Sequence, residues 1–288
     1  METHTLALPE VDLVYDVHGP LPPADGRPPL LLVGQPMDAS GFSALAGLMA
    51  GRTVLTYDPR GLGRSSVRRD GRTDMVPAVQ AEDLHRLIAH VGGPVEVFGS
   101  SGGAIVGLAL VTAHPQDVVT LVAHEPPLST ALPDAEAAQR ARQGFFDAYQ
   151  AKGAGAGMAQ FIAMTSWQGE FTDAYFAQPT PDPAAFGLPT EDDGRRDDPL
   201  LSERARAVTD YVLDTAAVAA ASTRVVIAVG EESAGTYTAR TSEAVARALG
   251  QEAVVFPSHH GGFMDGTFGY PGKPEEFAAR LIEVLGPR

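Results

Sequence analysis

The chain has 288 residues, enough for one large domain with or without an inserted second unit, and no apolar run is long enough to span a bilayer. Its 44% hydrophobic and 20% charged residues are typical of a globular protein, and a formal net charge of −15 disfavours nucleic acid and anionic membranes as partners. The absence of cysteine excludes disulfides, thiolate catalysis and cysteine-based metal sites.

The N-terminal segment shows neither the basic region nor the apolar region of a secretory signal, so we expect a cytoplasmic location. Residues 11–17 alternate apolar and polar side chains, which predicts a half-buried strand. A loop rich in proline and glycine follows from Gly19 to Pro29.

Apolar runs typical of buried parallel strands then recur along the chain, at 30–33, 53–57, 95–98, 118–123, 225–229 and 253–256. Helical segments lie between most of them, among them 76–91, 104–113, 239–249 and 274–285. Strands that alternate with helices predict an α/β fold with a doubly wound, mostly parallel sheet.

The strand at 95–98 is followed by a turn with the G-x-S-x-G pattern, Gly99 to Gly103, and then by an apolar helix. Only Ser101 occupies the serine position of this frame. A serine on such a strand-turn-helix elbow exposes its hydroxyl beside the backbone N–H of the next residue. The pattern alone is common in a glycine-rich chain, but its position favours a nucleophile over an ordinary turn.

The alternation of strands and helices stops between residues 126 and 222. We therefore interpret 1–126 and 222–288 as the core and 127–221 as a helical cap inserted after the sixth strand. The cap is expected to contain helical stretches at 134–152, 158–168 and 200–220 and a surface loop at 178–199. Its aromatic side chains, Trp167 among them, either line a substrate pocket or form the cap's own core.

Three further motifs stand at predicted strand ends. The loop Val33 to Ser40 is similar to an H-G-x-P loop with valine in place of histidine, and Asp58 to Ser65 matches D-x-R-G-x-G-x-S. A late histidine lies in the sequence Pro257 to Phe263. Together with the elbow, and in this order, these motifs resemble the α/β-hydrolase family over nearly the whole chain. The resemblance implies an α/β-hydrolase fold with a helical cap.

The resemblance also implies an acyl-transfer site with Ser101 as the nucleophile. His260 is the expected base, because it precedes Gly261 and Gly262 as in the family's H-x-G-aromatic pattern, whereas His259 is expected to be a loop residue. The catalytic acid does not stand at the position that is usual in the family. The family's G-x-x-D segment is here Gly230 to Ser233, so serine stands where aspartate is usual.

Some branches of the family, including certain dehalogenases and the zearalenone lactonases, place the acid after the sixth strand. This chain has His124-Glu125-Pro126 at that point. We therefore assign the acid to Glu125 and keep Glu232 as the alternative; a purely structural carboxylate at the strand end is the other explanation for Glu125.

The family position of the loop after residue 33 suggests that Gln35, with Met37 as second choice, supplies one oxyanion N–H. Gly102, the residue after the nucleophile, is expected to supply the other. Met37 and Trp167 are the expected substrate contacts. The resemblance implies no cofactor and no metal, and His124-Glu125 lacks the second histidine of a zincin motif.

The predicted function is a serine hydrolase that cleaves a carboxylic ester or lactone of a small, fairly apolar molecule through an acyl-enzyme. Serine at the elbow argues against epoxide hydrolase or haloalkane dehalogenase chemistry, since the resembling enzymes of those kinds use aspartate there. Two alternatives stay open. One is a C–C bond hydrolase of the meta-cleavage-product type. The other is a hydrolase-like ligand-binding protein with little turnover, which the missing G-x-x-D acid motivates.

Overall fold

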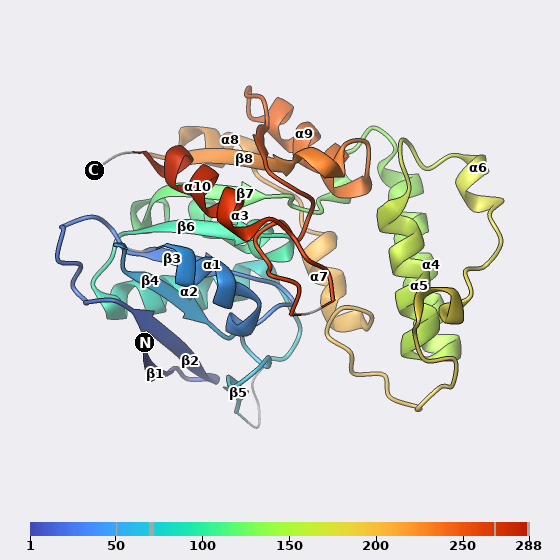
Figure 1. The fold of residues 1–288 in the computed structure, drawn as a ribbon, viewed down its shortest axis with the longest axis horizontal. Helices are drawn as coiled ribbons and strands as arrows, with labels where there is room; N and C mark the ends of the chain where they lie inside the picture. The colour runs from blue at the N-terminus through green and yellow to red at the C-terminus, as the bar shows by residue number, and fades with distance from the viewer. Residues whose placement is uncertain (50, 69–71, 268, 287–288) are drawn as a thin grey trace.

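The computed structural model describes residues 1–49, 51–68, 72–267 and 269–286 of the chain. Within these residues nine strands form one sheet in the spatial order β1-β2-β4-β3-β6-β7-β8-β9, with β5 paired to β2 (Figure 1). The strands are β1 (Glu2–Ala7), β2 (Val11–His18), β3 (Leu30–Val33), β4 (Val54–Tyr57), β5 (Ser66–Val67), β6 (Val95–Ser100), β7 (Val118–His124), β8 (Arg224–Gly230) and β9 (Val254–Phe256). The run from β4 to β9 in this order is parallel, which confirms the predicted α/β-hydrolase fold with a mostly parallel sheet.

The register of the parallel strands aligns their carboxyl ends. Ser100 at the end of β6 lies opposite His124 at the end of β7, which in turn lies opposite Ala228 of β8. Gly230, the last residue of β8, lies opposite Phe256 of β9. The loops that follow these strands therefore leave the sheet at one edge, which is where open parallel sheets bind ligands.

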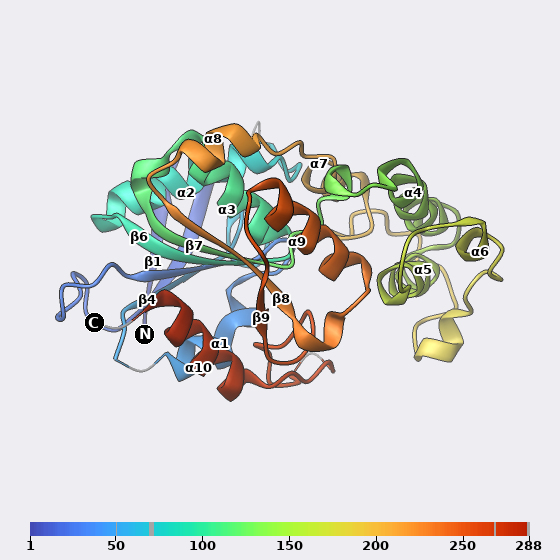
Figure 2. The ribbon, with the colours of Figure 1, turned by 90° about the horizontal axis from the view of Figure 1, so that it is seen from above.

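Helices cover both faces of the sheet (Figure 2). The α-helices are α1 (Ser43–Leu48), α2 (Pro77–Val91), α3 (Gly102–Ala113), α4 (Ala135–Lys152), α5 (Ala154–Ser166), α6 (Asp173–Phe176), α7 (Arg206–Thr209), α8 (Thr215–Ala220), α9 (Tyr237–Ala248) and α10 (Pro274–Leu285). One apolar cluster packs α2, α3, α8 and α9 on one face, and a second packs α1 and α10 on the other. The central strands β3, β4 and β6 are buried along their whole length because both faces of the sheet are covered.

The segment between β7 and β8 is helical and extends to one side of the sheet, where α4 and α5 form an antiparallel pair (Figure 1). Its own apolar cluster includes Phe145, Phe146, Tyr149 and Met164, together with Tyr237 from α9. Further along, α7 and α8 pack against the main core. The division into core and cap at residues 127 and 221 stays an interpretation, since the last third of the segment shares its packing with the core.

The structure differs from the sequence-based prediction at several places, among them strands β1 and β5 and two segments between β7 and β8. Strand β1 was not predicted; it pairs with β2 at the sheet edge, and most of its side chains are exposed. The expected helical stretch at 200–220 is broken, because Asp214 caps α8 by accepting a hydrogen bond from the N–H of Ala217 at 2.9 Å. The expected surface loop at 178–199 is mostly exposed but contains the short 3₁₀ helix Pro183–Phe186.

No helix among the described residues combines the length and the hydropathy that crossing a bilayer requires.

Candidate active site

The predicted nucleophile Ser101 lies at the turn between β6 and α3 with a φ of 58° and a ψ of −127°. This conformation is rare for a residue with a side chain and marks stored backbone strain. The N–H of Ser101 donates a hydrogen bond to the carbonyl oxygen of His124 at 2.9 Å, which ties the turn to the end of β7. The hydroxyl is held at the carboxyl edge of the sheet, in front of the N-terminus of α3.

The elbow can form only because its neighbours lack side chains. A Cβ on Gly99 would lie 2.7 Å from the carbonyl oxygen of Gly103, and a Cβ on Gly102 would lie 2.6 Å from that of Gln35. A Cβ on Gly103 would collide with the carbonyl group of Val33. The turn is therefore packed directly against the loop that follows β3.

The predicted base and the predicted acid are in contact. His260, in the loop after β9, donates its Nδ1–H to Oε2 of Glu125, 2.6 Å away. The Glu125 side chain is fully buried, whereas 36% of the His260 side chain is exposed. This bond fixes the tautomer of the imidazole and leaves Nε2 for other partners.

Three groups in addition to His260 bind the Glu125 carboxylate. The N–H of Gly230 donates to Oε1 at 2.9 Å, and the Thr238 hydroxyl, on α9, donates to Oε2 at 2.6 Å. Ser233 also hydrogen-bonds to this carboxylate. The backbone of Glu125 has a positive φ of 48°, so the residue turns out of the strand direction into this pocket of donors.

The donors determine the charge state of Glu125. Burial by itself would raise the pKa of this carboxyl group, but the hydrogen bond and the charge of His260, the charge of His124 and the bond from Ser233 outweigh it. The pKa of Glu125 consequently lies well below its ordinary value. The group is an anion at neutral pH, as a carboxylate that orients an imidazole must be.

The alternative acid, Glu232, is placed elsewhere. It lies in the 3₁₀ helix Glu231–Ser233, with 44% of its side chain exposed, and forms an ion pair with Lys273 at 2.7 Å. Its pKa is lowered by the hydrogen bond from Lys273. His260 is bonded to Glu125 and not to Glu232 in the described part of the chain.

The histidine next to His260 has a different environment. His259 donates from Nε2 to the carbonyl oxygen of Pro271 at 3.0 Å and accepts the N–H of Gly261 on Nδ1 at 3.1 Å. Both of its ring nitrogens are thus engaged within the loop. His124 is fully buried, with its ring 6.1 Å from the ring of His260, and burial lowers its pKa to about 4.

The predicted oxyanion loop lies against the elbow. Gln35 is buried, and its side chain packs on Gly102, while both polar atoms of its amide find no hydrogen-bond partner among the described residues. Met37, next in this loop, is half-buried and packs against the apolar cluster of α1 and α10. Gln35 and Gly102 are therefore neighbours, as the two halves of an oxyanion hole must be.

One expected contact, between the nucleophile and the base, is not made in this structure. Among the described residues, no hydrogen bond joins the hydroxyl of Ser101 to His260; such bonds are often long in ligand-free enzymes. Trp167 ends α5, donates its indole N–H to the carbonyl oxygen of Glu170 at 3.0 Å and contacts the ring of Tyr175 edge-on. Its contacts are therefore those of the cap's own aromatic cluster.

Sequence reasoning missed the partners of the acid, Thr238 and Ser233. No local pattern identifies them, since Thr238 is 113 positions from Glu125 in the chain. The only available signal was the serine in the position where the family's aspartate is usual.

Comparisons with known proteins agree with this geometry at the level of the family. A sequence model described as the alpha/beta hydrolase family matches residues 30–280. The chain is 38% identical to a Bacillus subtilis (strain 168) protein named as an uncharacterized hydrolase, YraK. That match spans 124 residues, or 42% of this chain and 44% of YraK. It is also 35% identical to a Variovorax paradoxus (strain S110) protein named as a candidate carbamate hydrolase, RutD. That match spans 113 residues, or 38% of this chain and 41% of RutD.

These two matches therefore span less than half the length of each relative. Among solved structures, that of a thermophilic esterase from Thermogutta terrifontis matches with a TM-score of 0.63 at 22% identity. The match covers 99% of this chain and 98% of that one, and at this identity it shows the fold alone.

Proposed function

The chain belongs to the alpha/beta hydrolase family, and from this premise we propose that it is a serine hydrolase of carboxylic esters or lactones of small, fairly apolar molecules. The observation that carries the proposal is the 2.6 Å bond between His260 and the buried Glu125 carboxylate, at the same sheet edge as the strained elbow of Ser101. An anionic acid, an oriented imidazole and a serine that is partly exposed at an elbow are the groups that acyl transfer needs.

In the proposed mechanism, His260 takes the proton of the Ser101 hydroxyl through Nε2 while the serine oxygen attacks the carbonyl carbon. The resulting imidazolium is stabilised by Glu125, and it returns the proton to the leaving alkoxide. An acyl-enzyme remains on Ser101. Water, deprotonated by the same imidazole, then releases the acid and restores the serine.

Charge that develops on the carbonyl oxygen needs donors next to the elbow. We propose the backbone N–H of Gly102 and that of Gln35, whose loops are in contact. Loss of one such donor typically costs about 3 kcal/mol of transition-state stabilisation.

The test is a pre-steady-state assay with a short-chain p-nitrophenyl ester. We expect a burst of p-nitrophenol and labelling by a fluorophosphonate, and both should be lost in Ser101→Ala. Ser100→Ala is the matched control, because Ser100 is adjacent but buried with its hydroxyl 3.4 Å from Nδ1 of His124.

Glu125→Gln should lower kcat about 10³-fold or more, while Glu232→Gln should leave it near the wild-type value. A collapse in Glu232→Gln alone would refute the assignment of the acid.

Two other activities are distinguished by the same protein samples. Turnover of vinylogous diketones without ester turnover would favour C–C hydrolysis, and tight ligand binding with no burst and no labelling would favour a binding protein. The Glu125 carboxylate, bound by these donors and by His260, supports an enzyme over a binding protein, because it takes the place of the acid that the G-x-x-D segment lacks. The relative named for carbamate hydrolysis makes carbamates a useful second substrate class, since their cleavage uses the same acyl transfer.

The cytoplasm is the proposed location, and cell fractionation would test it.

A further inference from the structure

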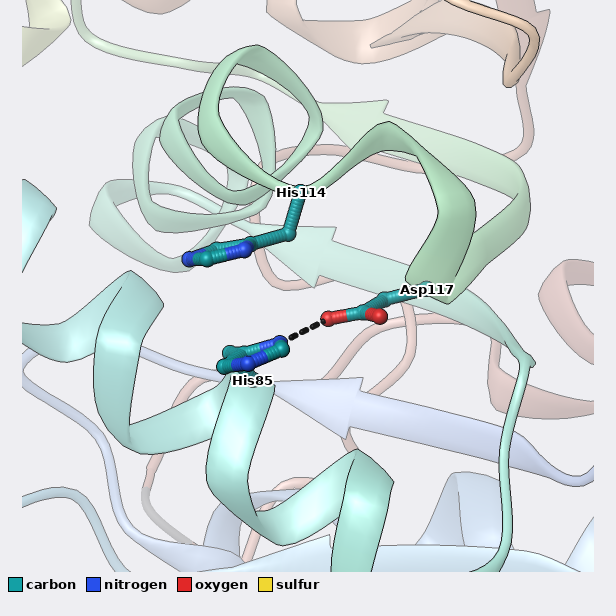
Figure 3. A group of neighbouring side chains, drawn as sticks. All are labelled: His85, His114 and Asp117. Carbon is teal, nitrogen blue, oxygen red and sulfur yellow. Dashed lines mark hydrogen bonds and ion pairs between the residues drawn. The ribbon is translucent and has the colours of Figure 1, made fainter.

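Two histidines and one aspartate lie close together in a partly buried cluster (Figure 3). His85 belongs to α2, His114 follows the last residue of α3, and Asp117 ends the 3₁₀ helix Pro115–Asp117. One ligand atom from each side chain lies within 4.8 Å of the others. We propose that these three residues bind a divalent transition-metal ion, with Zn²⁺ as the reference ion.

The donor set has the chemistry that such ions prefer. Imidazole nitrogens and carboxylate oxygens are ligands of Zn²⁺, Ni²⁺ and Cu²⁺, and three protein ligands leave a position for water. The Nε2–H of His114 donates to Glu82 at 3.2 Å. This bond leaves the lone pair on Nδ1 available to a metal ion. A carboxylate behind a histidine in this way orients the ring and strengthens its ligand nitrogen.

The short bond within the cluster marks the place of the ion. Nδ1–H of His85 donates to Oδ2 of Asp117 at 2.6 Å. A metal ion would take the place of the proton between these two atoms, and that proton would move to Nε2 of His85, so the neutral imidazole would bind through Nδ1 with no net release of a proton. The ion would carry two positive charges into a chain whose formal net charge is −15.

The geometry needs only side-chain movement. The rings of His85 and His114 are stacked, with centroids 3.9 Å apart and planes 7° apart. Ligand atoms about 2.0–2.2 Å from a tetrahedral ion are roughly 3.4 Å from one another, within the spread of the cluster. The ion must lie in the plane of each ring, so the rings must tilt out of the stack. The two side chains are 32% and 23% exposed, so solvent leaves room for that tilt.

The position of the cluster separates it from the candidate active site. Asp117 immediately precedes β7, so the cluster lies at the amino edge of the parallel strands, opposite the edge that carries Ser101 and Glu125. An ion there would fasten α2 to the connection between α3 and β7. This proposal departs from the expectation that no metal is implied, because His85 is too distant in the chain from His114 and Asp117 to form a motif.

The experiment is a titration of the full chain with Zn²⁺, followed by calorimetry and by thermal unfolding. We expect one ion per chain and a midpoint temperature raised by about 5 °C when free Zn²⁺ is about 100-fold above Kd. The double variant His85→Gln, His114→Gln should lose this binding, and Asp117→Asn should weaken it at least tenfold. His90→Gln is the matched control, since His90 lies exposed on the same helix.

Circular dichroism checks that each variant is folded, and Asp117→Asn keeps the shape of the side chain. Co²⁺ gives a second readout, because its visible absorption intensifies when imidazole and carboxylate replace water. Zn²⁺ binding that survives in the double variant, or that is lost in His260→Gln instead, would overturn the proposal. Absence of binding to the wild-type chain would overturn it as well.

Discussion

At the scale of single residues, the candidate acid depends on a hydroxyl from another element. Thr238 donates to Oε2 of Glu125, the same oxygen that His260 contacts. Thr238→Val keeps the shape of the side chain and removes that donor. A hydrogen bond to a charged group is worth about 1.5–3 kcal/mol, so we expect kcat for the p-nitrophenyl ester to fall roughly tenfold or more, with KM little changed.

Thr238→Ser should restore most of the rate. Thr241→Val is the matched control, because Thr241 is buried on the same helix but donates to the carbonyl oxygen of Thr238 at 3.0 Å, not to Glu125. Equal losses of rate in Thr238→Val and Thr241→Val would indicate a general effect on α9.

The same residues show how far sequence reasoning reaches. Ser101, Glu125 and His260 follow the ends of strands that their apolar runs predict, and parallel pairing brings such ends to one edge. Local sequence is therefore enough to propose these three. The donor Thr238 could not be proposed, because its contact with Glu125 requires α9 to pack against β8, and that packing is a property of the tertiary structure.

At the scale of elements, the best predictions concern segments buried on both faces. Strands such as β3, with four buried apolar residues, have a composition that only a covered sheet accommodates. Strand β1 has no such signal, since it is an edge strand held by backbone pairing with β2. The break between α7 and α8 likewise depends on one local cap at Asp214, which a pattern of apolar residues does not reveal.

One element joins the cap to the candidate site. Arg240 on α9 forms an ion pair with Asp134, which precedes α4, and donates to the carbonyl oxygen of Gly169 at 2.8 Å. Both charged side chains are largely buried, at 13% and 11% exposure. Asp134 also accepts the N–H of Phe171 at 2.8 Å. Arg240 thus fastens two cap segments to the helix that carries Thr238.

Arg240→Met should leave Asp134 buried without its charged partner and destabilise the chain by about 3 kcal/mol in urea unfolding. We also expect KM for the ester to rise more than kcat falls, since the cap, not the acyl-transfer groups, is released. The double variant Arg240→Met, Asp134→Leu should recover most of the stability. Arg247→Met, an exposed position on the same helix, is the control and should change neither quantity. Unchanged stability in Arg240→Met would contradict the proposed link.

At the scale of the whole molecule, an excess of acidic groups is held ionised by a small number of cations. Arg64 donates hydrogen bonds to both Asp16 and Asp58. Burial would raise the pKa of each carboxyl group, but these bonds lower both below their ordinary values. Carboxyl groups whose pKa is lower in the folded state stabilise it above about pH 4, and this contribution is lost as the pH falls further. The free energy of unfolding should therefore decrease below about pH 4. A group that destabilises the fold at higher pH would add an earlier stage to this decrease.

His124 is a group that should lower the stability before these carboxyl groups are protonated. Burial among the rings of Phe98, Phe256 and Phe277 lowers its pKa from 6.5 to about 4, although the charge of Glu125 opposes that shift. Between pH 6.5 and pH 4 the unfolded chain therefore binds one proton more than the folded chain at this position. Stability must then decrease as the pH falls through this window, by about 3 kcal/mol in total.

His124→Phe tests this, because Nε2 of His124 has no hydrogen-bond partner among the described residues and the surrounding cage is aromatic. Urea unfolding at several pH values from 7 to 4 should show a smaller loss of stability in the variant than in the wild type, with a difference of about 3 kcal/mol across the range. The comparison uses the slope with pH, so a constant packing cost of the larger ring does not affect it. His90→Ala, which removes an exposed imidazole from the same chain, is the control for the loss of a histidine. If the His124→Phe curve is parallel to that of the wild type, the buried imidazole is not the group that destabilises the fold above pH 4.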